Sequence, residues 1–400
     1  MDARLGLVVL TVFGLTAGCT ENKLRAGHCE RDTDCPPGQS CVLEGAATFT
    51  CAASDGGLPD GDASEVAPEC TASSQCPVER PICDAQTCRA CDSARFGDGT
   101  ACASRDSTRP LCGPTGACVE CVSTTSADCN ANLAKPICDL ASNTCVGCSG
   151  DDQCAAKGGG PGVCMSHQDG RCAADSEVIY VENKAGCATS ALTPGAGSAT
   201  SPFCGPQLAI DGLTTSRRVV LISGPVMGAT WTVTSASTPV TFVGRTAAAI
   251  APGTTVGMRV TGPGDLYARD LVVRNSELVG VIAENGATLR LDHVTIDSNR
   301  GGGISIDNSA FDVRNTTITA NGPGQAGGGV VWGGIRIDAP GNPASLALVT
   351  VSNNQSAGVS CSGPIAGLGV LAADNLGGVD VTSACQVPPC SPAGPTCGAQ

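Results

Sequence analysis

Three acidic residues in the second half of the sequence have a spacing that suggests a shared site. Glu284, Asp307 and Asp338 directly follow similar alternating segments, GVIA, GISI and GIRI. Clustered carboxylates bind Ca²⁺ or act as general acids and bases, and Arg336 lies two residues before Asp338. ENG, DNS and DAP are also typical turn starts, in which the acid accepts backbone hydrogen bonds. We therefore treat Asp307 and Asp338 as candidate catalytic groups, and Glu284 and Arg336 as candidate ligand contacts.

Two further side chains are candidates by residue type. His293, one of three histidines, follows Asp292 in LDHVTID and would act as a base or hold a strand bend. Trp332 lies in NGPGQAGGGVVWGG, a stretch of loop-like composition, where function tends to lie. Its indole is expected to contact a ligand or to cover an apolar patch. Tyr267 is the other aromatic expected to face outward, and the sequence has no nucleophile motif, P-loop or dinucleotide fingerprint.

The elements that must position these residues recur along the chain. Five glycines open similar segments at spacings of 23, 23, 31 and 24 residues, namely Gly257, Gly280, Gly303, Gly334 and Gly358. Aliphatic residues then alternate with mostly polar ones, a period that indicates a strand with one buried face. The side chains expected to point inward are Met258 and Val260, Val281 and Ala283, Ile304 and Ile306, Ile335 and Ile337, and Val359 and Cys361. Each segment is therefore interpreted as one turn of a coil.

Two more strands are predicted in each turn. The second is marked by Leu289/Leu291, Phe311/Val313 and Leu346/Leu348, and the third by Leu271/Val273, Val294/Ile296, Thr316/Ile318 and Val349/Val351. Three short strands per turn predict a parallel β-helix, whose turns hydrogen-bond to one another at about 4.8 Å. In this register Arg290 neighbours Asp312, while Asn299 and Asn321 end their strands alike. We expect these asparagines to form a ladder between turns.

Residues 178–385 resemble the right-handed parallel β-helix, or pectin-lyase-like, superfamily. The resemblance rests on these repeats and on the opening VIYV and PFCGPQLAID, which match the first strand and the cap of that fold. It implies an all-β, right-handed, single-stranded parallel β-helix over residues 177–385. Enzymes of the superfamily cleave or epimerise acidic polysaccharides with clustered carboxylates, a basic residue and often Ca²⁺. The resemblance implies less about activity, because this fold hosts many functions.

Cysteines lie at both ends of the predicted β-helix. Cys187 and Cys204 flank the expected cap and are expected to form a disulfide. An open end would expose a bare sheet edge, so a cap is needed on physical grounds. The other end, with a tail at 386–400, is expected to be stapled by cysteines from the set Cys361, Cys385, Cys390 and Cys397.

Cysteines dominate the first half of the chain. Twenty of the 27 lie between Cys29 and Cys172, in five groups of four. A unit this short cannot bury a useful core, so disulfides of roughly 2–4 kcal/mol each are expected to replace it. Zinc is the alternative, because CRAC, CVEC and CVGC have a zinc-ligand spacing. We expect the first unit at 19–51, an acidic flexible linker at 52–69 and four disulfide units at 70–172, with the pairings left open.

The first residues have the pattern of a secretion signal. One arginine precedes an apolar stretch from Leu5 to Ala17, which is too short to span a bilayer. The stretch ends in LTAGC, which resembles a bacterial lipobox. That resemblance implies a signal peptide at 1–18 and lipidation of Cys19, and Thr20 after it favours delivery to the outer membrane or the surface. A signal that is simply cleaved is the alternative.

The overall composition narrows the function. The net charge of −14 and the pI near 4.6 argue against a nucleic-acid partner, which requires a basic surface. We predict an exported protein, lipid-anchored at the surface or periplasmic face of the outer membrane. It would display a β-helix on a disulfide-rich stalk, for binding polysaccharide or surface proteins or for a structural role. The alternative is a polysaccharide lyase, hydrolase or epimerase. No cofactor is expected apart from a possible requirement for Ca²⁺.

Overall fold

The computed structural model describes residues 39–44, 48–53, 68–94, 98–123, 129, 133–157, 160–228, 230–234, 239–325, 331–377 and 379–387. The chain divides into two compact units, Met1–Glu69 and Cys70–Gln400. The first unit contains a hairpin of β1 (Gln39–Glu44) and β2 (Thr48–Ala53), with Cys41 opposite Cys51. Cys19 and the predicted signal peptide lie outside the described residues.

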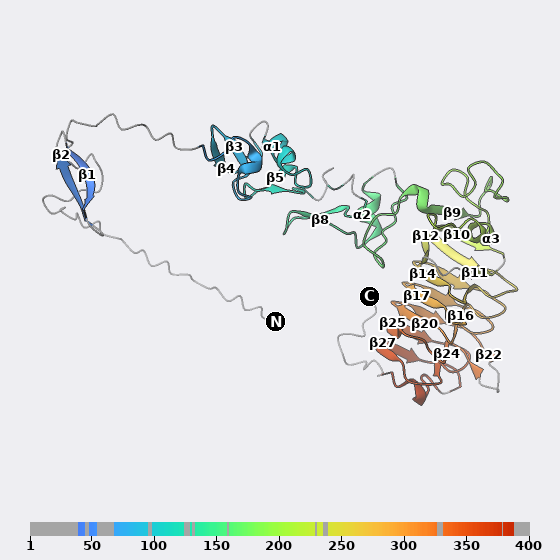
Figure 1. Ribbon diagram of the computed structural model, residues 1–400. Helices are drawn as coiled ribbons and strands as arrows, with labels where there is room; N and C mark the ends of the chain where they lie inside the picture. Colours follow the sequence, from blue (N-terminus) through green and yellow to red (C-terminus); the bar gives the residue numbers. More distant parts are fainter. Residues whose placement is uncertain are drawn as a thin grey trace, which may run out of the picture. The chain divides into compact units, whose positions relative to one another are not determined.

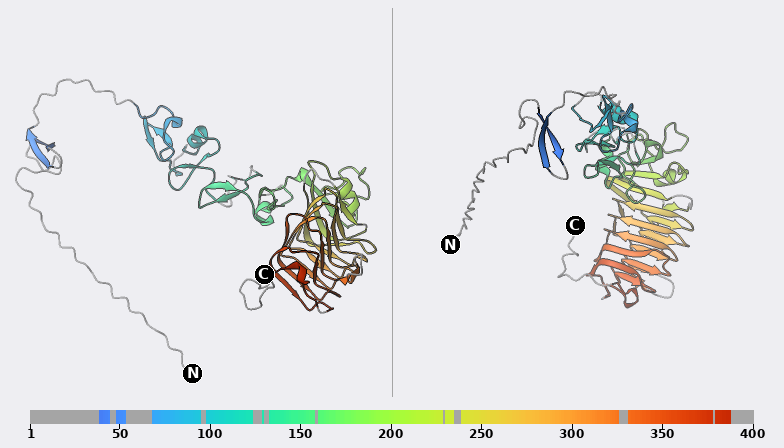
Figure 2. Two further views of the ribbon diagram at one scale, coloured as in Figure 1. Left: turned by 60° about the horizontal axis from the view of Figure 1, so that its bottom comes forward. Right: turned by 60° about the vertical axis from the view of Figure 1, so that its left-hand side comes forward.

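From β9 onward, the second unit is a parallel β-solenoid of about 6 turns, so the predicted fold class is confirmed. Figures 1 and 2 show its strands stacked as successive rungs. One face is a 6-stranded parallel sheet with the order β11-β13-β16-β19-β24-β26. These strands are β11 (Trp231–Val233), β13 (Met258–Thr261), β16 (Val281–Glu284), β19 (Ile304–Asp307), β24 (Ile335–Asp338) and β26 (Val359–Cys361).

The other two faces belong to one 11-stranded sheet, because two long strands turn the corner between them. The first half of β12 (Val240–Ala251) pairs with β14 (Asp265–Arg269), and its second half pairs with β15 (Val272–Arg274). On a later turn, β25 (Ala344–Ser352) pairs in the same way with β20 (Ala310–Arg314) and β21 (Thr317–Thr319). The remaining strands are β9 (Val178–Glu182), β10 (Val219–Met227), β17 (Thr288–Asp292), β18 (Thr295–Asp297), β20 (Ala310–Arg314), β21 (Thr317–Thr319) and β27 (Ala366–Ala373).

The interior of the solenoid is a stack of aliphatic rows. Ile304 and Ile306 are 0% exposed and align with Ile335 and Ile337 of the next turn, so these predicted inward rows are confirmed. Leu348 was predicted to point inward and does not, since it is 46% exposed. It occupies the corner between the two halves of β25 with φ +55°. The inward pair of that strand begins two residues earlier, because Phe311 aligns with Ala344 and Val313 with Leu346.

A glycine column and an asparagine ladder lie side by side at one corner. A Cβ on Gly303 would lie 2.5 Å from the Gly334 carbonyl oxygen and 3.2 Å from Nδ2 of Asn321. A side chain there would therefore push neighbouring turns apart. The side-chain amide of Asn321 donates to the Ile296 carbonyl at 2.9 Å and to Oδ1 of Asn354 at 3.1 Å. The predicted ladder is confirmed and continues from Asn299 through Asn321 and Asn354 to Asn375.

The two ends of the solenoid are closed differently. At the start, α3 (Pro206–Asp211) packs beside β11, and a disulfide joins Cys187 to Cys204 next to it. At the other end, η6 (Ser383–Cys385) follows β27, and a disulfide joins Cys361 to Cys385. The predicted contributions of Cys390 and Cys397 fall outside the described residues.

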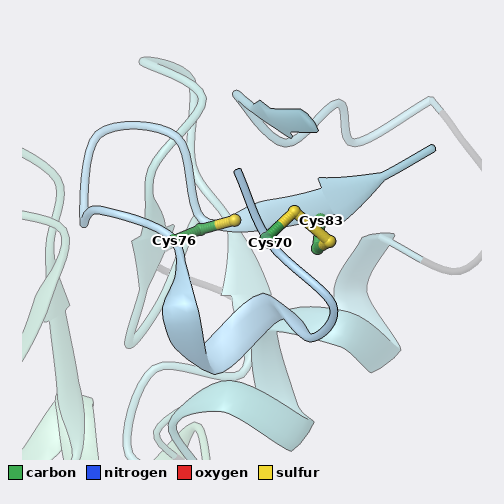
Figure 3. Close-up of side chains that lie close together, drawn as sticks. All are labelled: Cys70, Cys76 and Cys83. Carbon is green, nitrogen blue, oxygen red and sulfur yellow. A yellow bond between two sulfur atoms is a disulfide. The ribbon is translucent and has the colours of Figure 1, made fainter. Parts of the chain in front are cut away.

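The cysteine units share one pairing pattern. In each of the four units from Cys70 to Cys172, the first cysteine bonds to the third and the second to the fourth. The bonds are Cys70–Cys83, Cys76–Cys88, Cys91–Cys112, Cys102–Cys118, Cys121–Cys138, Cys129–Cys145, Cys148–Cys164 and Cys154–Cys172. Figure 3 shows the Cys70–Cys83 bond beside Cys76. The pairing that the sequence left open is thus the same throughout.

A hairpin explains this pattern. The third and fourth cysteines lie opposite each other on antiparallel strands, for example Cys138 and Cys145, so both sulfurs point to the same side. There they meet the two cysteines of the preceding loop. The elements are η2 (Ser73–Gln75), β3 (Ile82–Asp84), β4 (Thr87–Arg89), α1 (Asp98–Arg105), β5 (Leu111–Cys112), β6 (Cys118–Val119), β7 (Ile137–Asp139), β8 (Thr144–Val146), α2 (Asp151–Ala155) and η4 (Asp175–Glu177).

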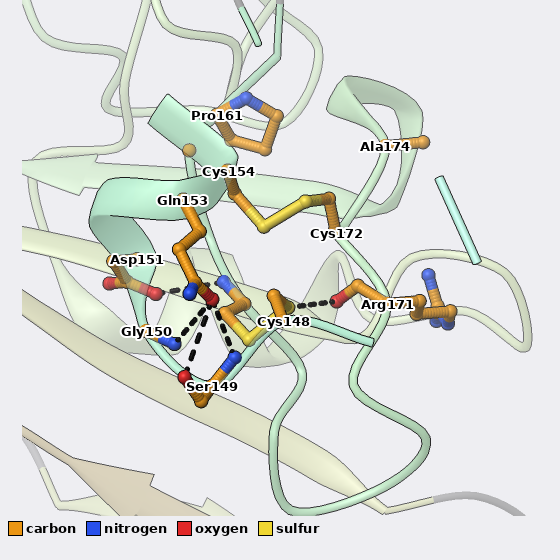
Figure 4. The surroundings of a disulfide bond; sticks show 12 residues. Cys148, Ser149, Gly150, Asp151, Gln153, Cys154, Pro161, Arg171, Cys172 and Ala174 are labelled. Atoms are coloured by element: carbon orange, nitrogen blue, oxygen red, sulfur yellow. Dashed lines mark hydrogen bonds between the residues drawn. A yellow bond between two sulfur atoms is a disulfide. The ribbon is translucent and has the colours of Figure 1, made fainter. Parts of the chain in front are cut away.

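A glutamine before the second cysteine shapes the loop in two of the units. Oε1 of Gln153 accepts hydrogen bonds from the Ser149 and Gly150 amides at 2.7 and 3.4 Å (Figure 4). Gln75 occupies the equivalent place and accepts from the Thr71 amide at 2.6 Å. These bonds satisfy backbone groups that such small units cannot pair in a sheet.

Candidate functional site

The three predicted acids form one column on the outside of the solenoid. Glu284, Asp307 and Asp338 are the last residues of β16, β19 and β24, and they are direct partners in the parallel register. Parallel neighbours lie about 4.8 Å apart. Unscreened like charges at that distance repel by roughly 1 kcal/mol in water-like surroundings. The arrangement is therefore stable only with solvent or counter-charge close by.

Arginines supply counter-charge at both ends of the acid column. Arg336 pairs with Asp338 at 2.9 Å, and Arg259 lies 3.5 Å from Glu284. Asp307, between them, is exposed and has no ion pair among the described residues. The positions that follow the acids, Asn285, Asn308 and Ala339, all have positive φ. Each begins a turn, and neighbouring coils are joined there by backbone bonds such as Asn308 N–H to the Asp338 carbonyl at 3.0 Å.

His293 does not join the acid column. Its side chain is 65% exposed, and Nδ1 lies 3.0 Å from Oδ1 of Asp292. It occupies the corner after β17, whereas Glu284 precedes that strand on the same turn. β17 has five residues, so the two corners are roughly 13 Å apart. The structure therefore does not bring the histidine and the acids together as a proton-transfer site.

Trp332 is buried, which corrects its assignment as a ligand contact. Its side chain is only 2% exposed. It belongs to a small hairpin of β22 (Gly324–Gln325) and β23 (Val331–Trp332). The indole lies over Gly302 and Gly324, where an added Cβ would approach the ring to 2.5 and 2.7 Å. The two glycines make room for the indole, so the ring covers backbone and is not available to stack on a sugar.

Tyr267 points outward as expected but is covered by the last cysteine unit. It is 5% exposed and stacks on the ring of His167, with centroids 3.7 Å apart and planes at 9°. An apolar cluster also joins the last cysteine unit to the solenoid. The cluster comprises Val163, Met165 and Ala173 of the unit and Val178, Val219, Leu221 and Val243 of the solenoid. The last unit therefore caps the outer face of the first turns.

Ion pairs complete this docking contact. Oδ1 of Asp151 lies 2.5 Å from Arg269 on β14, and Oδ2 lies 3.4 Å from Arg245. The same carboxylate accepts the Cys164 amide at 2.8 Å. In an earlier unit Ser73 has the same role, because its Oγ accepts a hydrogen bond from the Cys83 amide at 3.1 Å. In the last unit, an acid at this equivalent position both closes the loop and binds the solenoid.

The docking contact was missed from sequence, although a signal was present. Strands with one buried face alternate, as GISID does, but VIYV and VVLI are continuously apolar, and VTFV is interrupted only by Thr241. A continuous apolar run indicates burial on both faces. These runs belong to β9, β10 and β12, the strands whose outer face carries the last cysteine unit.

Comparison with known proteins found a family match for the cysteine units but none for the solenoid. Residues 56–178 match the model of a family of unknown function (DUF8331). That stretch ends at Val178, the first residue of β9, so the family boundary coincides with the start of the solenoid. No curated protein and no solved structure matches the chain.

The structure also bears on zinc binding by the cysteines and on membrane-spanning helices. Among the residues that the structure describes, three groups of cysteine sulfurs lie within 4.8 Å of one another, but their members are joined in disulfides. Zinc binds thiolates, so the zinc alternative is not supported there. In the described part of the chain, no helix is both long and apolar enough to cross a membrane. The remaining candidate for ligand contact is the polar outer face that carries the acid column.

Proposed function

We propose that the protein is an exported, lipid-anchored protein of the cell envelope, in which a disulfide-rich stalk displays a pectin-lyase-like β-helix. The observation that carries the proposal is the set of eight disulfides in four successive units. Disulfides of this density persist outside the reducing cytosol. They support an extracellular or periplasmic location. The lipid anchor on Cys19, and the outer membrane as its destination, rest on the lipobox-like LTAGC.

The proposed role is binding, adhesion or structural support at the surface. A solenoid presents rigid columns of side chains at a fixed spacing, which suits an extended ligand. Thr295, Thr317 and Thr350 form one such column, and Glu284, Asp307 and Asp338 form another. Hydroxyl and carboxylate groups at these spacings favour a polysaccharide, with Ca²⁺ as a bridge if the polysaccharide is itself acidic. Surface proteins are the other partner class.

The anchor is tested by replacing Cys19 with serine. The wild-type chain should fractionate with membranes and partition into detergent, because two or more acyl chains hold a protein stably on a bilayer. The Cys19→Ser chain should appear in the soluble exported fraction, with its disulfides intact. A control variant, Thr189→Ala at an exposed bend, should behave as wild type. Retention of Cys19→Ser on membranes would refute the lipid anchor but not the display of the solenoid.

The ligand is tested by titrating the purified chain against a panel of polyuronates, with and without Ca²⁺. We expect binding without turnover, weakened about tenfold by Asp307→Asn combined with Asp338→Asn, because about 1.4 kcal/mol of contact energy is removed. Asp297→Asn, on β18 and away from the column, should bind as wild type. Release of unsaturated sugar that is lost in His293→Gln would instead favour the polysaccharide-enzyme alternative. Binding that is unchanged when Asp307→Asn and Asp338→Asn are combined would contradict the proposed contact face.

A further inference from the structure

The imidazole of His167 is enclosed between the last cysteine unit and the solenoid. It stacks on Tyr267, and Nε2 lies 3.2 Å from Oγ1 of Thr241 on β12. Nδ1 is buried and has no hydrogen-bond partner. A neutral imidazole has one N–H group and therefore needs one hydrogen-bond acceptor. An imidazolium has two N–H groups, and both need acceptors. The geometry therefore accepts the neutral ring and gives a second proton no acceptor.

The arginines that face His167 also disfavour protonation, while Asp169 acts in the opposite direction and more weakly than Arg269 and Arg290. Arg269 and Arg290 approach from the solenoid, and Arg171 and Asp169 belong to the unit itself. Nearby carboxylates pair with these arginines, as Asp265 does with Arg290. Asp292, the next acid on this face, accepts the Tyr267 hydroxyl at 3.3 Å. Burial first, and then Arg269 and Arg290, lower the pKa of His167 from 6.5 to about 4.

We propose that this contact is an acid-sensitive latch, which holds the last cysteine unit on the solenoid while His167 is neutral and loosens when the ring takes up a proton. The undocked ring would titrate near its ordinary value, above that of the docked ring. Docking is therefore fully favourable above about pH 6.5 and weakens as the pH falls toward 4. The shift corresponds to a loss of up to roughly 100-fold in the docking equilibrium.

An open latch would expose new surface. Val219, Leu221 and Val243 on the outer face of the solenoid would lose their cover. The cysteine units would then be joined to the solenoid only through the chain around η4. The stalk would gain freedom at that point, and an apolar patch would become available in acidic surroundings. This inference does not depend on the lipid anchor or on the acid column.

Hydrogen exchange on the full disulfide-bonded chain tests the latch. Protection of amides in residues 163–173, such as the Ala173 amide bonded to the Val163 carbonyl, would be compared at pH 7 and pH 4 after correction for intrinsic exchange. Wild type should lose roughly ten- to 100-fold more protection than His167→Gln, which keeps a polar group near Thr241 and does not titrate. Peptides from β16 to β20 should stay protected in both chains.

Two further variants keep the test decisive. His293→Gln removes an exposed histidine and should follow wild type, while His167→Phe keeps the stack and should resist acid if His167→Gln is poorly folded. Equal loss of protection in wild type and both His167 variants would assign the effect to the Asp151–Arg269 pair and overturn the proposal. Full protection of wild type at pH 4 would also overturn it.

Discussion

Replacing Asn321 with leucine is expected to destabilise the solenoid more than any other single change on its outer corners. Asn321 is fully buried and accepts hydrogen bonds from the Asn299 amide at 3.0 Å and from its Nδ2 at 2.9 Å. Leucine has a similar shape but would leave these donors, and the Ile296 carbonyl, without partners. Each buried unpaired group costs about 1–3 kcal/mol, so the free energy of unfolding should fall by about 3–5 kcal/mol.

Denaturant unfolding followed by tryptophan fluorescence measures this effect. Both tryptophans, Trp231 and Trp332, are buried in the solenoid and report on it. Thr317→Val, on the outer side of β21 in the same turn, is the matched control and should change stability by less than about 0.5 kcal/mol. If the Asn321→Leu chain unfolds at the same denaturant concentration as wild type, the ladder contributes nothing to stability.

Removing the Cys129–Cys145 disulfide is expected to unfold one cysteine unit and leave its neighbours folded. Among the residues that the structure describes, the buried cluster of that unit consists of Cys121, Cys129, Cys138 and Cys145. Serines at positions 129 and 145 would remove about 2–5 kcal/mol of stabilisation. Because the described residues of the unit form no other buried cluster of their own, residues 133–146 should lose hydrogen-exchange protection almost completely.

The solenoid supplies the control for this prediction. Cys361→Ser combined with Cys385→Ser also removes a disulfide, but Val359 and Ile365 there are buried in the main core. Protection of β24 to β27 should therefore fall only modestly. Retained protection at residues 133–146 in the first variant would mean that the unit has a source of stability other than its disulfides.

The sequence determined the register of the solenoid because period-two alternation and glycine spacing act locally. A side chain at Gly303 would clash with the Gly334 carbonyl of the next turn. The same requirement recurs on each turn and is therefore visible in the sequence as a repeat of glycines. The same register placed Glu284, Asp307 and Asp338 in one column. The prediction that Leu348 points inward was wrong, because an alternating pattern does not show where a strand turns a corner.

Contacts between distant segments were not predictable in this way. Trp332 was expected either to contact a ligand or to cover an apolar patch, and the sequence did not show that Gly302 and Gly324 open a space for its ring. Tyr267 was expected to be free, but a loop 100 residues earlier in the sequence, ending in His167, covers it. Such contacts depend on how separate units pack, and only the continuous apolar runs of β9 and β10 signalled them.

Mass spectrometry of the intact protein, isolated from the membranes of the cells that make it, tests the central claim most directly. The sample would be denatured without reductant and treated with a thiol-alkylating reagent. We predict a chain that begins at an acylated Cys19, with no alkylation at the cysteines of the ten disulfides among the described residues. A chain that retains its first 18 residues and is alkylated at those cysteines would contradict export, lipid anchoring and the disulfide-bonded stalk together.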